Sequence, residues 1–259
     1  MLTVCGLQLD LVWEDPALNF ERAERLIESA RRTHEARLIV LPEMFATGFS
    51  MRASAIVDHA EKTSRFLSEC AVRHGCWVLG GLACAGIEKP RNTAVLYDPE
   101  GHERLRYEKI HPFSLAHEDE HFEGGLRLPV VTVEGVRLCV LICYDLRFPE
   151  PFRLRADEVD LFIVIANWPE ARRAAWSTLL AARAIENQAY VLGVNRVGEG
   201  NGLRYTGDSA LHGPLGEVLE SASLVEALVA GEIDPQRVED VRAKFGFLGD
   251  RRPEVYKSL

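Results

Sequence analysis

Short runs of aliphatic and β-branched residues alternate along this chain with longer segments whose apolar residues recur every three or four positions. The first pattern is typical of buried strands, and the second is typical of amphipathic helices. Strands are predicted at residues 3–9, 38–41, 76–84, 92–97, 103–107, 128–133, 136–142, 161–166, 190–195, 208–212, 217–219 and 224–233. Helices are predicted from residue 16, over 62–74, from 149, from about 170 to 188, and over 235–245.

Turn and capping residues mark the boundaries of these elements. Asp15 is the predicted cap of the first helix, and Pro16 takes its first helical position. Turns at residues 99–102, 134–135 and 213–216 predict hairpins. Because hairpins interrupt the alternation of strands and helices, the pattern favours two mixed sheets packed face to face, with helices outside. We therefore expect an α/β fold, a four-layer α-β-β-α sandwich, formed by residues 1–259 as a single domain.

The composition narrows the range of partners. Hydrophobic residues make up 47% of the chain and charged residues 27%, which is usual for a globular protein, and the formal net charge is −9. This charge argues against nucleic acid and anionic membranes as partners, and no apolar run is long enough to span a bilayer. The six cysteines form no C-x-x-C pair, and the N-terminus does not resemble a signal peptide. We therefore expect a reduced, cytoplasmic protein.

Three ionisable residues, Glu43, Lys109 and Cys143, each lie just beyond the end of a predicted strand. Open α/β sheets build their sites at strand ends. Cys143 lies where the chain turns toward the helix at Pro149, and backbone N–H groups at such a turn favour a thiolate. Each residue also has an ordinary explanation when taken alone: an inert core cysteine, a solvated carboxylate and a surface lysine.

Taken together, the same residues fit one reaction. Cys143 can attack a carboxamide while Glu43 acts as its base. The attack creates an oxyanion, which Lys109 and the backbone N–H of Tyr144 can stabilise. The sequence therefore predicts a cysteine-dependent amidase that forms a thioester and releases ammonia, without a cofactor.

Three sequence blocks carry a family resemblance: Leu-Pro-Glu-Met-Phe at 41–45, Lys-Ile-His-Pro-Phe at 109–113, and Cys-Tyr-Asp-Leu-Arg-Phe-Pro at 143–149. In this order and at these separations, they resemble the signature blocks of the nitrilase, or carbon–nitrogen hydrolase, superfamily. Weaker blocks at 166–169, 182–190 and 207–209 extend the resemblance over about residues 3–245.

The resemblance implies an α-β-β-α sandwich that usually dimerises through helices, and a Glu-Lys-Cys triad that maps to Glu43, Lys109 and Cys143. A further family glutamate follows the lysine. It maps best to Glu120, because residues 120–125 keep the order glutamate, aromatic residue and glycine, and Glu118 is the competing position.

The blocks at 45–50 and 166–169 look closest to the omega-amidase branch. This resemblance implies omega-amides of 2-oxo dicarboxylic acids, such as 2-oxoglutaramate, as the small-molecule substrate. N-carbamoyl amino acids are the alternative within the family. Arg147 is the candidate for binding the substrate carboxylate through its planar guanidinium group. Trp168 is the candidate for contacting the apolar part of the substrate, and Asn167 is a further candidate substrate-binding residue.

The segment His-Glu-Asp-Glu-His at residues 117–121 gives an alternative from another class. His117 and His121 lie four residues apart, so a helical segment would direct both imidazoles toward one zinc ion. A metal-dependent hydrolase is disfavoured because the segment reads as a loop and the sequence offers no evident third ligand. We therefore expect no metal site.

Overall fold

The first of two six-stranded sheets contains both the first and the last of the strands that the structure describes, β1 and β14. The computed structural model describes residues 1–256. The strand order is β14-β1-β2-β3-β4-β5, with β1 parallel to β2 and β2 parallel to β3. The other pairings are antiparallel, so the sheet is mixed. Its strands are β1 (Leu2–Gln8), β2 (Leu38–Val40), β3 (Trp77–Cys84), β4 (Arg91–Tyr97), β5 (Glu103–Glu108) and β14 (Ala227–Ile233).

The second sheet is also mixed, with the order β13-β12-β9-β8-β7-β6. Its central strands β7, β8 and β9 are parallel, and the outer pairings are antiparallel. Its strands are β6 (Val130–Val133), β7 (Val136–Ile142), β8 (Leu161–Ala166), β9 (Tyr190–Asn195), β12 (Ser209–His212) and β13 (Val218–Ala222). A separate hairpin joins β10 (Val197–Gly200) to β11 (Leu203–Thr206).

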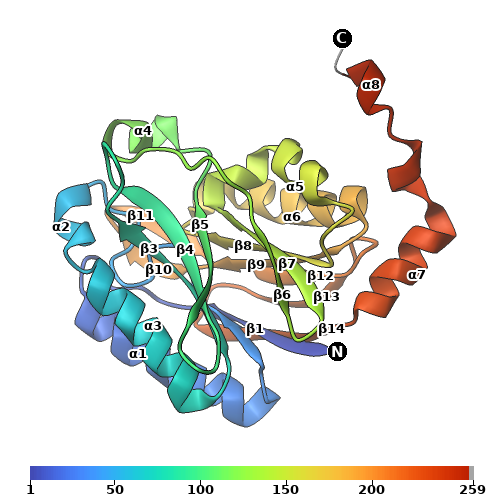
Figure 1. The fold of residues 1–259 in the computed structure, drawn as a ribbon. Helices are drawn as coiled ribbons and strands as arrows, with labels where there is room; N and C mark the ends of the chain where they lie inside the picture. Colours follow the sequence, from blue (N-terminus) through green and yellow to red (C-terminus); the bar gives the residue numbers. More distant parts are fainter. Residues whose placement is uncertain (257–259) are drawn as a thin grey trace.

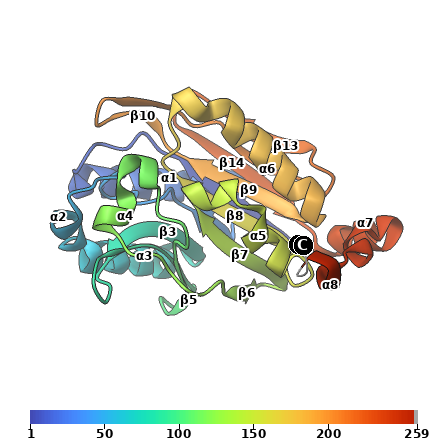
Figure 2. The ribbon, with the colours of Figure 1, turned by 90° about the horizontal axis from the view of Figure 1, so that it is seen from above.

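Helices form the two outer layers (Figures 1 and 2). Helices α1 (Pro16–His34) and α3 (Ala60–His74) pack on the first sheet, and α5 (Pro149–Arg155) and α6 (Arg173–Asn187) pack on the second. As predicted, Asp15 caps α1, accepting a 3.1 Å hydrogen bond from the backbone N–H of Leu18. The remaining helices are α2 (Ala53–Val57), α4 (Glu118–His121), α7 (Pro235–Phe245) and α8 (Pro253–Tyr256), with 3₁₀ turns at 114–116, 143–147, 170–172 and 247–250.

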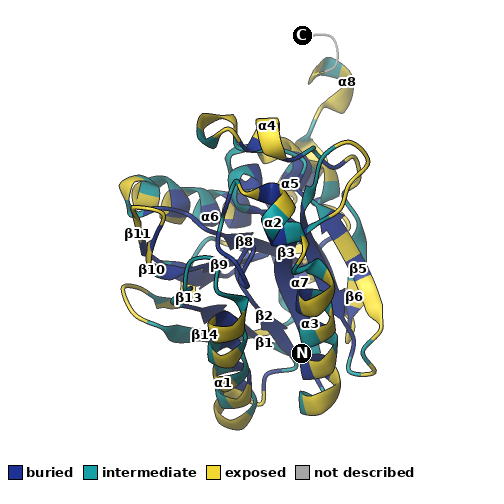
Figure 3. Ribbon diagram, turned by 90° about the vertical axis from the view of Figure 1, so that its left-hand side faces the viewer, coloured by how far each residue is buried: buried dark blue, intermediate teal, exposed yellow. Residues whose placement is uncertain are grey.

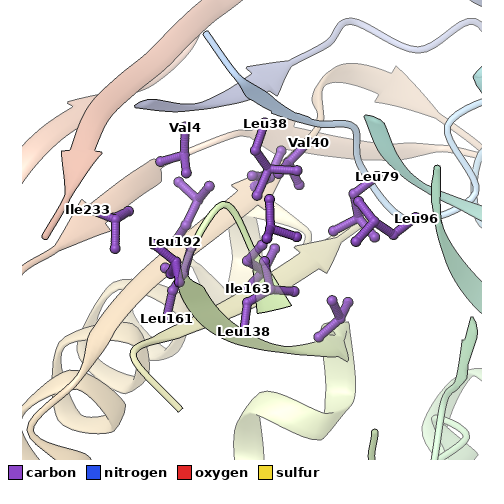
Figure 4. Close-up of a cluster of buried hydrophobic side chains, with 14 of the residues drawn as sticks. Val4, Leu38, Val40, Leu79, Leu96, Leu138, Leu161, Ile163, Leu192 and Ile233 are labelled. Carbon is purple, nitrogen blue, oxygen red and sulfur yellow. The ribbon is translucent and has the colours of Figure 1, made fainter. Parts of the chain in front are cut away.

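The core lies between the two sheets, whose inner faces consist largely of Leu, Val and Ile (Figure 4). Leu38 and Leu79 from the first sheet pack in the same cluster as Leu138 and Ile163 from the second. Burial follows the layers, because the strands are mostly buried while the helices expose one face (Figure 3). The expectation of a four-layer α-β-β-α sandwich is confirmed.

Some local predictions need correction. No strand was predicted between residues 195 and 208, but Val197–Gly200 pairs with Leu203–Thr206 as the hairpin β10–β11. The segment 117–121, expected to be a loop, contains the single helical turn α4, and the last strand begins at Ala227 instead of residue 224. Such a short helix is not stable alone, so its formation depends on tertiary contacts that a sequence pattern does not contain.

The strand directions bring several chain segments to one end of the sandwich. In the first sheet, β5 runs in the same direction as β2 and β3, because two antiparallel pairings separate β5 from β3. In the second sheet, β7 and β8 end together. A 2.8 Å hydrogen bond from the backbone N–H of Asn167, directly after β8, to Oε2 of Glu43, beyond β2, joins the two sheet ends. Among residues 1–256, no helix is long and apolar enough to cross a membrane.

Candidate active site

A buried lysine lies at the centre of this end of the sandwich. Lys109 directly follows β5, and its side chain is only 1% exposed. Its Nζ lies 3.1 Å from Oε1 of Glu43 and 2.8 Å from Oε2 of Glu118, and both carboxylates are fully buried. A buried ammonium is costly unless carboxylates and hydrogen bonds compensate it. The two carboxylates therefore fix the position of Lys109.

Asn92, the second residue of β4, holds the same two carboxylates from another side. Its Nδ2 donates to Oε1 of Glu43 at 2.7 Å and to Oε1 of Glu118 at 2.9 Å. The backbone N–H of Phe113 donates to the other oxygen of Glu118 at 2.6 Å. Glu43, Lys109, Glu118 and Asn92 thus form one hydrogen-bonded cluster, and each hydrogen bond limits the rotation of the carboxylates.

The backbone around Glu43 packs closely against β3. A Cβ atom at Gly81 would lie 2.7 Å from Cα of Glu43 and 2.7 Å from the backbone N of Met44, so only glycine fits at this point. Met44 itself has a left-handed backbone, with φ of +43°. The Asn167 side chain donates from Nδ2 to the backbone O of Glu43 at 2.6 Å. Glu43 is therefore held both at its backbone and at its side-chain carboxylate.

Cys143 lies at the turn between β7 and a 3₁₀ segment over residues 143–147. Its φ of +46° is uncommon for a residue with a side chain, and such strain often occurs at functional sites. The Sγ atom lies 4.0 Å from the backbone O of Asn167. Tyr144 is the second residue of the 3₁₀ segment, where a helix leaves its backbone N–H groups without intrahelical partners.

Asp145 fixes this turn. Its fully buried carboxylate accepts hydrogen bonds from the backbone N–H of Ile142 at 3.0 Å and from the Tyr107 hydroxyl at 2.7 Å. It also accepts a 3.0 Å bond from the backbone N–H of His111 and lies 2.7 Å from its Nδ1. Tyr107 and His111 flank Lys109 in sequence. Asp145 therefore links the cysteine turn to the chain segment that carries the lysine.

The protonation of the site follows from burial and these charges. Burial raises the pKa of the Cys143 thiol well above its usual value, and Glu43 adds to this effect while Lys109 opposes it. Burial alone would lower the pKa of Lys109, but the carboxylates of Glu118 and Glu43 outweigh it and raise the pKa. Burial raises the pKa of Glu118 against the opposing effect of Lys109. At neutral pH the resting site therefore holds a cationic lysine and a protonated thiol.

A cavity of about 130 Å³ opens onto Cys143. Aromatic and other apolar side chains form much of its wall, with arginine as the only charged residue type in the lining among residues 1–256. The guanidinium of Arg147 stacks over the Trp168 ring at 4.9 Å, and that of Arg172 stacks over the Phe113 ring at 5.1 Å. The lining consists of Phe49, Met51, Phe113, Ala116, Cys143, Tyr144, Arg147, Asn167, Trp168, Pro169, Arg172, Asn201, Leu203 and Tyr205.

The structure brings together most of the residues that the sequence singled out. Glu43 and Cys143 both contact Asn167, and Lys109 contacts Glu43. Tyr144, Arg147 and Trp168 line the cavity beside the thiol.

The expected position of Glu120 is wrong, and Glu118 takes that place. Glu120 is exposed, and its carboxylate pairs with Nδ1 of His117 at 2.8 Å, whereas Glu118 contacts Lys109. His117 has a left-handed backbone and precedes the helical turn α4, so Glu118 turns inward and Glu120 points outward. The order of residue types in the segment could not distinguish these two positions.

The histidine pair of the metal alternative has no further ligand in the part of the chain that the structure describes. His117 is exposed and pairs with Glu120. Within residues 1–256, no group of three or more His, Cys, Asp or Glu side chains is placed to hold a metal ion.

Asn92 is the residue of the cluster that the sequence analysis missed. It is a buried amide within the strand β4, which otherwise packs apolar side chains such as those of Ala94 and Leu96 into the core. A polar residue among buried strand positions was the available signal, because such a side chain needs hydrogen-bond partners. Its partners come from residues 43 and 118, which only the fold brings close.

The position of Glu118 generates a first prediction. Glu118→Gln removes one of the two carboxylates that compensate Lys109 and allows Lys109 to shift, so we expect kcat for amide hydrolysis to fall by roughly 10²-fold. The matched control is Glu120→Gln, which should change kcat by less than about twofold, as is usual at exposed positions. Ammonia release under saturating substrate measures both. Equal losses in the two variants, or a larger loss in Glu120→Gln, would contradict the assignment.

The raised pKa of Cys143 generates a second prediction. Only thiolate reacts with iodoacetamide, so the alkylation rate of Cys143 in the substrate-free protein should rise continuously from pH 7 to pH 9. Peptide mass spectrometry measures the rate, and Cys143→Ala gives the background from the other cysteines. A rate that is already constant above pH 7 would show that the thiolate is the resting form.

Comparisons with known proteins show the family of this chain. The family model for carbon–nitrogen hydrolases matches residues 2–243. The omega-amidase YafV of Yersinia enterocolitica is 39% identical over 241 residues, which cover 92% of each protein. The 2-oxoglutaramate amidase of Bacillus subtilis is 32% identical, over 98% of this chain and 99% of the relative.

Solved structures show the same fold. XC1258 from Xanthomonas campestris, described as a CN-hydrolase superfamily protein with an arsenic adduct in its active site, superposes with a TM-score of 0.91 at 34% identity and 97% coverage of each chain. A mutant amidase from Nesterenkonia sp. AN1, described with acrylamide added to its active-site cysteine, has a TM-score of 0.89 at 25% identity, covering 100% of this chain and 99% of its own. The protein described here belongs to the carbon–nitrogen hydrolase family.

Proposed function

We propose that this protein is an omega-amidase that hydrolyses the omega-amide of a 2-oxo dicarboxylic acid, such as 2-oxoglutaramate, to the acid and ammonia. The observation that carries this proposal is the cavity, in which a thiol beside a buried Glu-Lys pair faces guanidinium groups. Such a cavity suits a short substrate with an amide at one end and a carboxylate at the other. The curated relatives named omega-amidase and 2-oxoglutaramate amidase support the same substrate class.

In the first half of the proposed reaction, Cys143 attacks the amide carbon while Glu43 accepts the thiol proton. The carbonyl oxygen becomes an oxyanion, stabilised by the charge of Lys109 and by the backbone N–H of Tyr144. Glu43 then returns the proton to the amide nitrogen, the C–N bond breaks, and ammonia leaves. A thioester between the acyl group and Cys143 remains.

The second half of the proposed reaction uses the same residues. Glu43 accepts a proton from water, and the resulting nucleophile attacks the thioester carbon. When the C–S bond breaks, the proton passes to the sulfur, so the acid leaves and the Cys143 thiol is restored. Glu118 acts in this scheme by holding Lys109 at 2.8 Å, and does not exchange protons with the substrate.

Substrate binding is proposed to involve three residues of the cavity. Arg147 presents two parallel N–H groups to the distal carboxylate, while Trp168 stacks against the guanidinium and walls the apolar part of the substrate. Oδ1 of Asn167 is buried and has no hydrogen-bond partner among the residues that the structure describes. We assign it as the acceptor for the NH₂ group of the substrate amide, because an unpaired buried oxygen is costly without such a donor.

We further propose that the chain forms a single carbon–nitrogen hydrolase domain and acts in the cytoplasm. We also propose that two copies assemble as a homodimer through α5 and α6. Leu154 on α5 is 75% exposed and Ile185 on α6 is 54% exposed. Side chains of this kind on the outer helical layer support a helix-to-helix interface.

The nucleophile assignment predicts that Cys143→Ala lowers ammonia release from 2-oxoglutaramate by about 10⁴-fold or more, because a nucleophile acts together with its base as a unit. Cys139→Ala is the matched control, since Cys139 is buried on β7 at a position facing the helical layer. It should cost packing alone. Near-native turnover by Cys143→Ala would end the hypothesis, and loss of activity on dialysis against EDTA would support the metal-dependent alternative.

The role of Arg147 predicts a loss that depends on the substrate carboxylate. Lysine cannot reproduce the fork, so Arg147→Lys should weaken kcat/KM for 2-oxoglutaramate by roughly 1.5–3 kcal/mol, the scale of a hydrogen bond to a charged group. The loss should be much smaller for a neutral amide of equal length. Both substrates are assayed with both proteins. Equal losses on the two amides would mean that Arg147 supports the turn and does not bind the carboxylate.

A further inference from the structure

The cavity is lined by a second arginine, Arg172, to which the proposed reaction assigns no role. Arg172 is the last residue of the 3₁₀ turn over 170–172, and it lines the cavity together with Arg147. Its guanidinium stacks over the Phe113 ring, and its backbone O accepts a 2.8 Å hydrogen bond from Nε1 of Trp168. Trp168 in turn stacks against Arg147. The two arginines are therefore held on one aromatic frame around the same small cavity.

The charge of Arg172 is not neutralised by an acidic side chain. Within residues 1–256, its guanidinium has no ion pair or hydrogen bond with another side chain, although it is half-buried. The neighbouring acids have other partners, because Glu170 lies 3.8 Å from Arg204 and Asp208 lies 2.6 Å from Arg173. Stacking on an aromatic ring stabilises a guanidinium without cancelling its charge and leaves its N–H edge available.

The buried carboxylates of the cluster with Lys109 do not compensate the charge of Arg172 either. Glu43 and Glu118 are fully buried and do not line the cavity, and both are bonded to Lys109 and Asn92. A ligand in the cavity therefore meets two guanidinium groups and, among the described lining residues, no carboxylate. The site is built for an anionic molecule without a cationic substituent.

We propose that Arg172 is a specificity-determining residue that, together with Arg147, makes the cavity an electrostatic filter that admits 2-oxo acid omega-amides and rejects the corresponding 2-amino acid amides. This inference rests on the proposed function and deepens it. An omega-amide of a 2-amino acid, such as glutamine, has the same length, amide and carboxylate as its 2-oxo counterpart. It differs at C2, where it carries an ammonium group.

The physical basis is the environment that the C2 substituent meets in the cavity. An ammonium group that leaves water needs an acceptor or a counter-ion, and here it finds like charge instead. A 2-oxo oxygen can accept a hydrogen bond from a guanidinium. Rejection of the wrong substrate by an unfavourable charge gives larger discrimination than a difference in shape, because one oxygen or nitrogen atom changes the volume little.

The test compares three five-carbon omega-amides that differ only at C2: 2-oxoglutaramate, glutaramate with no group at C2, and glutamine. The ratio of kcat/KM for glutaramate over glutamine measures the penalty for the ammonium alone. We expect Arg172→Gln to lower this ratio roughly 10-fold, and Arg172→Glu to lower it by up to about 100-fold, because the carboxylate then pairs with the ammonium. Arg172→Lys keeps the charge and should retain most of the ratio.

The matched control is Arg173→Gln, since Arg173 adjoins Arg172 but does not line the cavity and pairs with Asp208. It should leave the ratio unchanged. An unchanged ratio in both Arg172→Gln and Arg172→Glu, in proteins whose circular dichroism matches the wild type, would overturn the inference while leaving the proposed function intact. Failure of the wild type to hydrolyse 2-oxoglutaramate would overturn the proposed function and the filter together.

Discussion

The site depends on one buried ion cluster, in which the ammonium of Lys109 is held between the carboxylates of Glu43 and Glu118. Removing the ammonium of Lys109 would leave both buried carboxylates uncompensated, which costs several kcal/mol. The cluster therefore joins three chain segments that are far apart in sequence: the end of β2, the end of β5 and the turn α4. Its geometry requires the sheet ends to meet, so the same contacts that place Glu43 and Lys109 also hold the end of the sandwich together.

The cysteine is held by a second buried carboxylate. Asp145 accepts hydrogen bonds from Ile142, Tyr107 and His111, and it keeps the strained backbone of Cys143 at the end of β7. Because Tyr107 and His111 flank Lys109, a shift of the cysteine turn would also shift the segment that carries the lysine. Cys143 and Lys109 are thus positioned by one shared network, and the oxyanion stabilisation of the proposed reaction requires such preorganisation.

Negative and positive charges lie in different parts of the site: the carboxylates in the buried cluster and the guanidinium groups in the cavity lining. In the buried cluster, the two carboxylates of Glu43 and Glu118 flank the single ammonium of Lys109. Burial, together with the charge of Glu43, keeps the thiol of Cys143 protonated until a base accepts its proton. Around the cavity, Arg147 and Arg172 are stacked on aromatic rings. This separation allows proton transfer at the amide end of a substrate while the other end meets positive charge. In the proposed reaction, the chemistry is therefore assigned to Cys143, Glu43 and Lys109, and the choice of substrate to Arg147 and Arg172.

The sequence predicted the sandwich and singled out Glu43, Lys109 and Cys143 as candidate site residues. Strand and helix patterns are local, and Glu43, Lys109 and Cys143 each follow a strand within blocks of residues whose order is visible in the chain. Only the tertiary structure decided between Glu118 and Glu120, because a left-handed backbone at His117 sets which of them faces Lys109. The same holds for Asn92 and Arg172. Their roles depend on partners from distant segments, and a one-dimensional pattern records the type of each residue but not what packs against it.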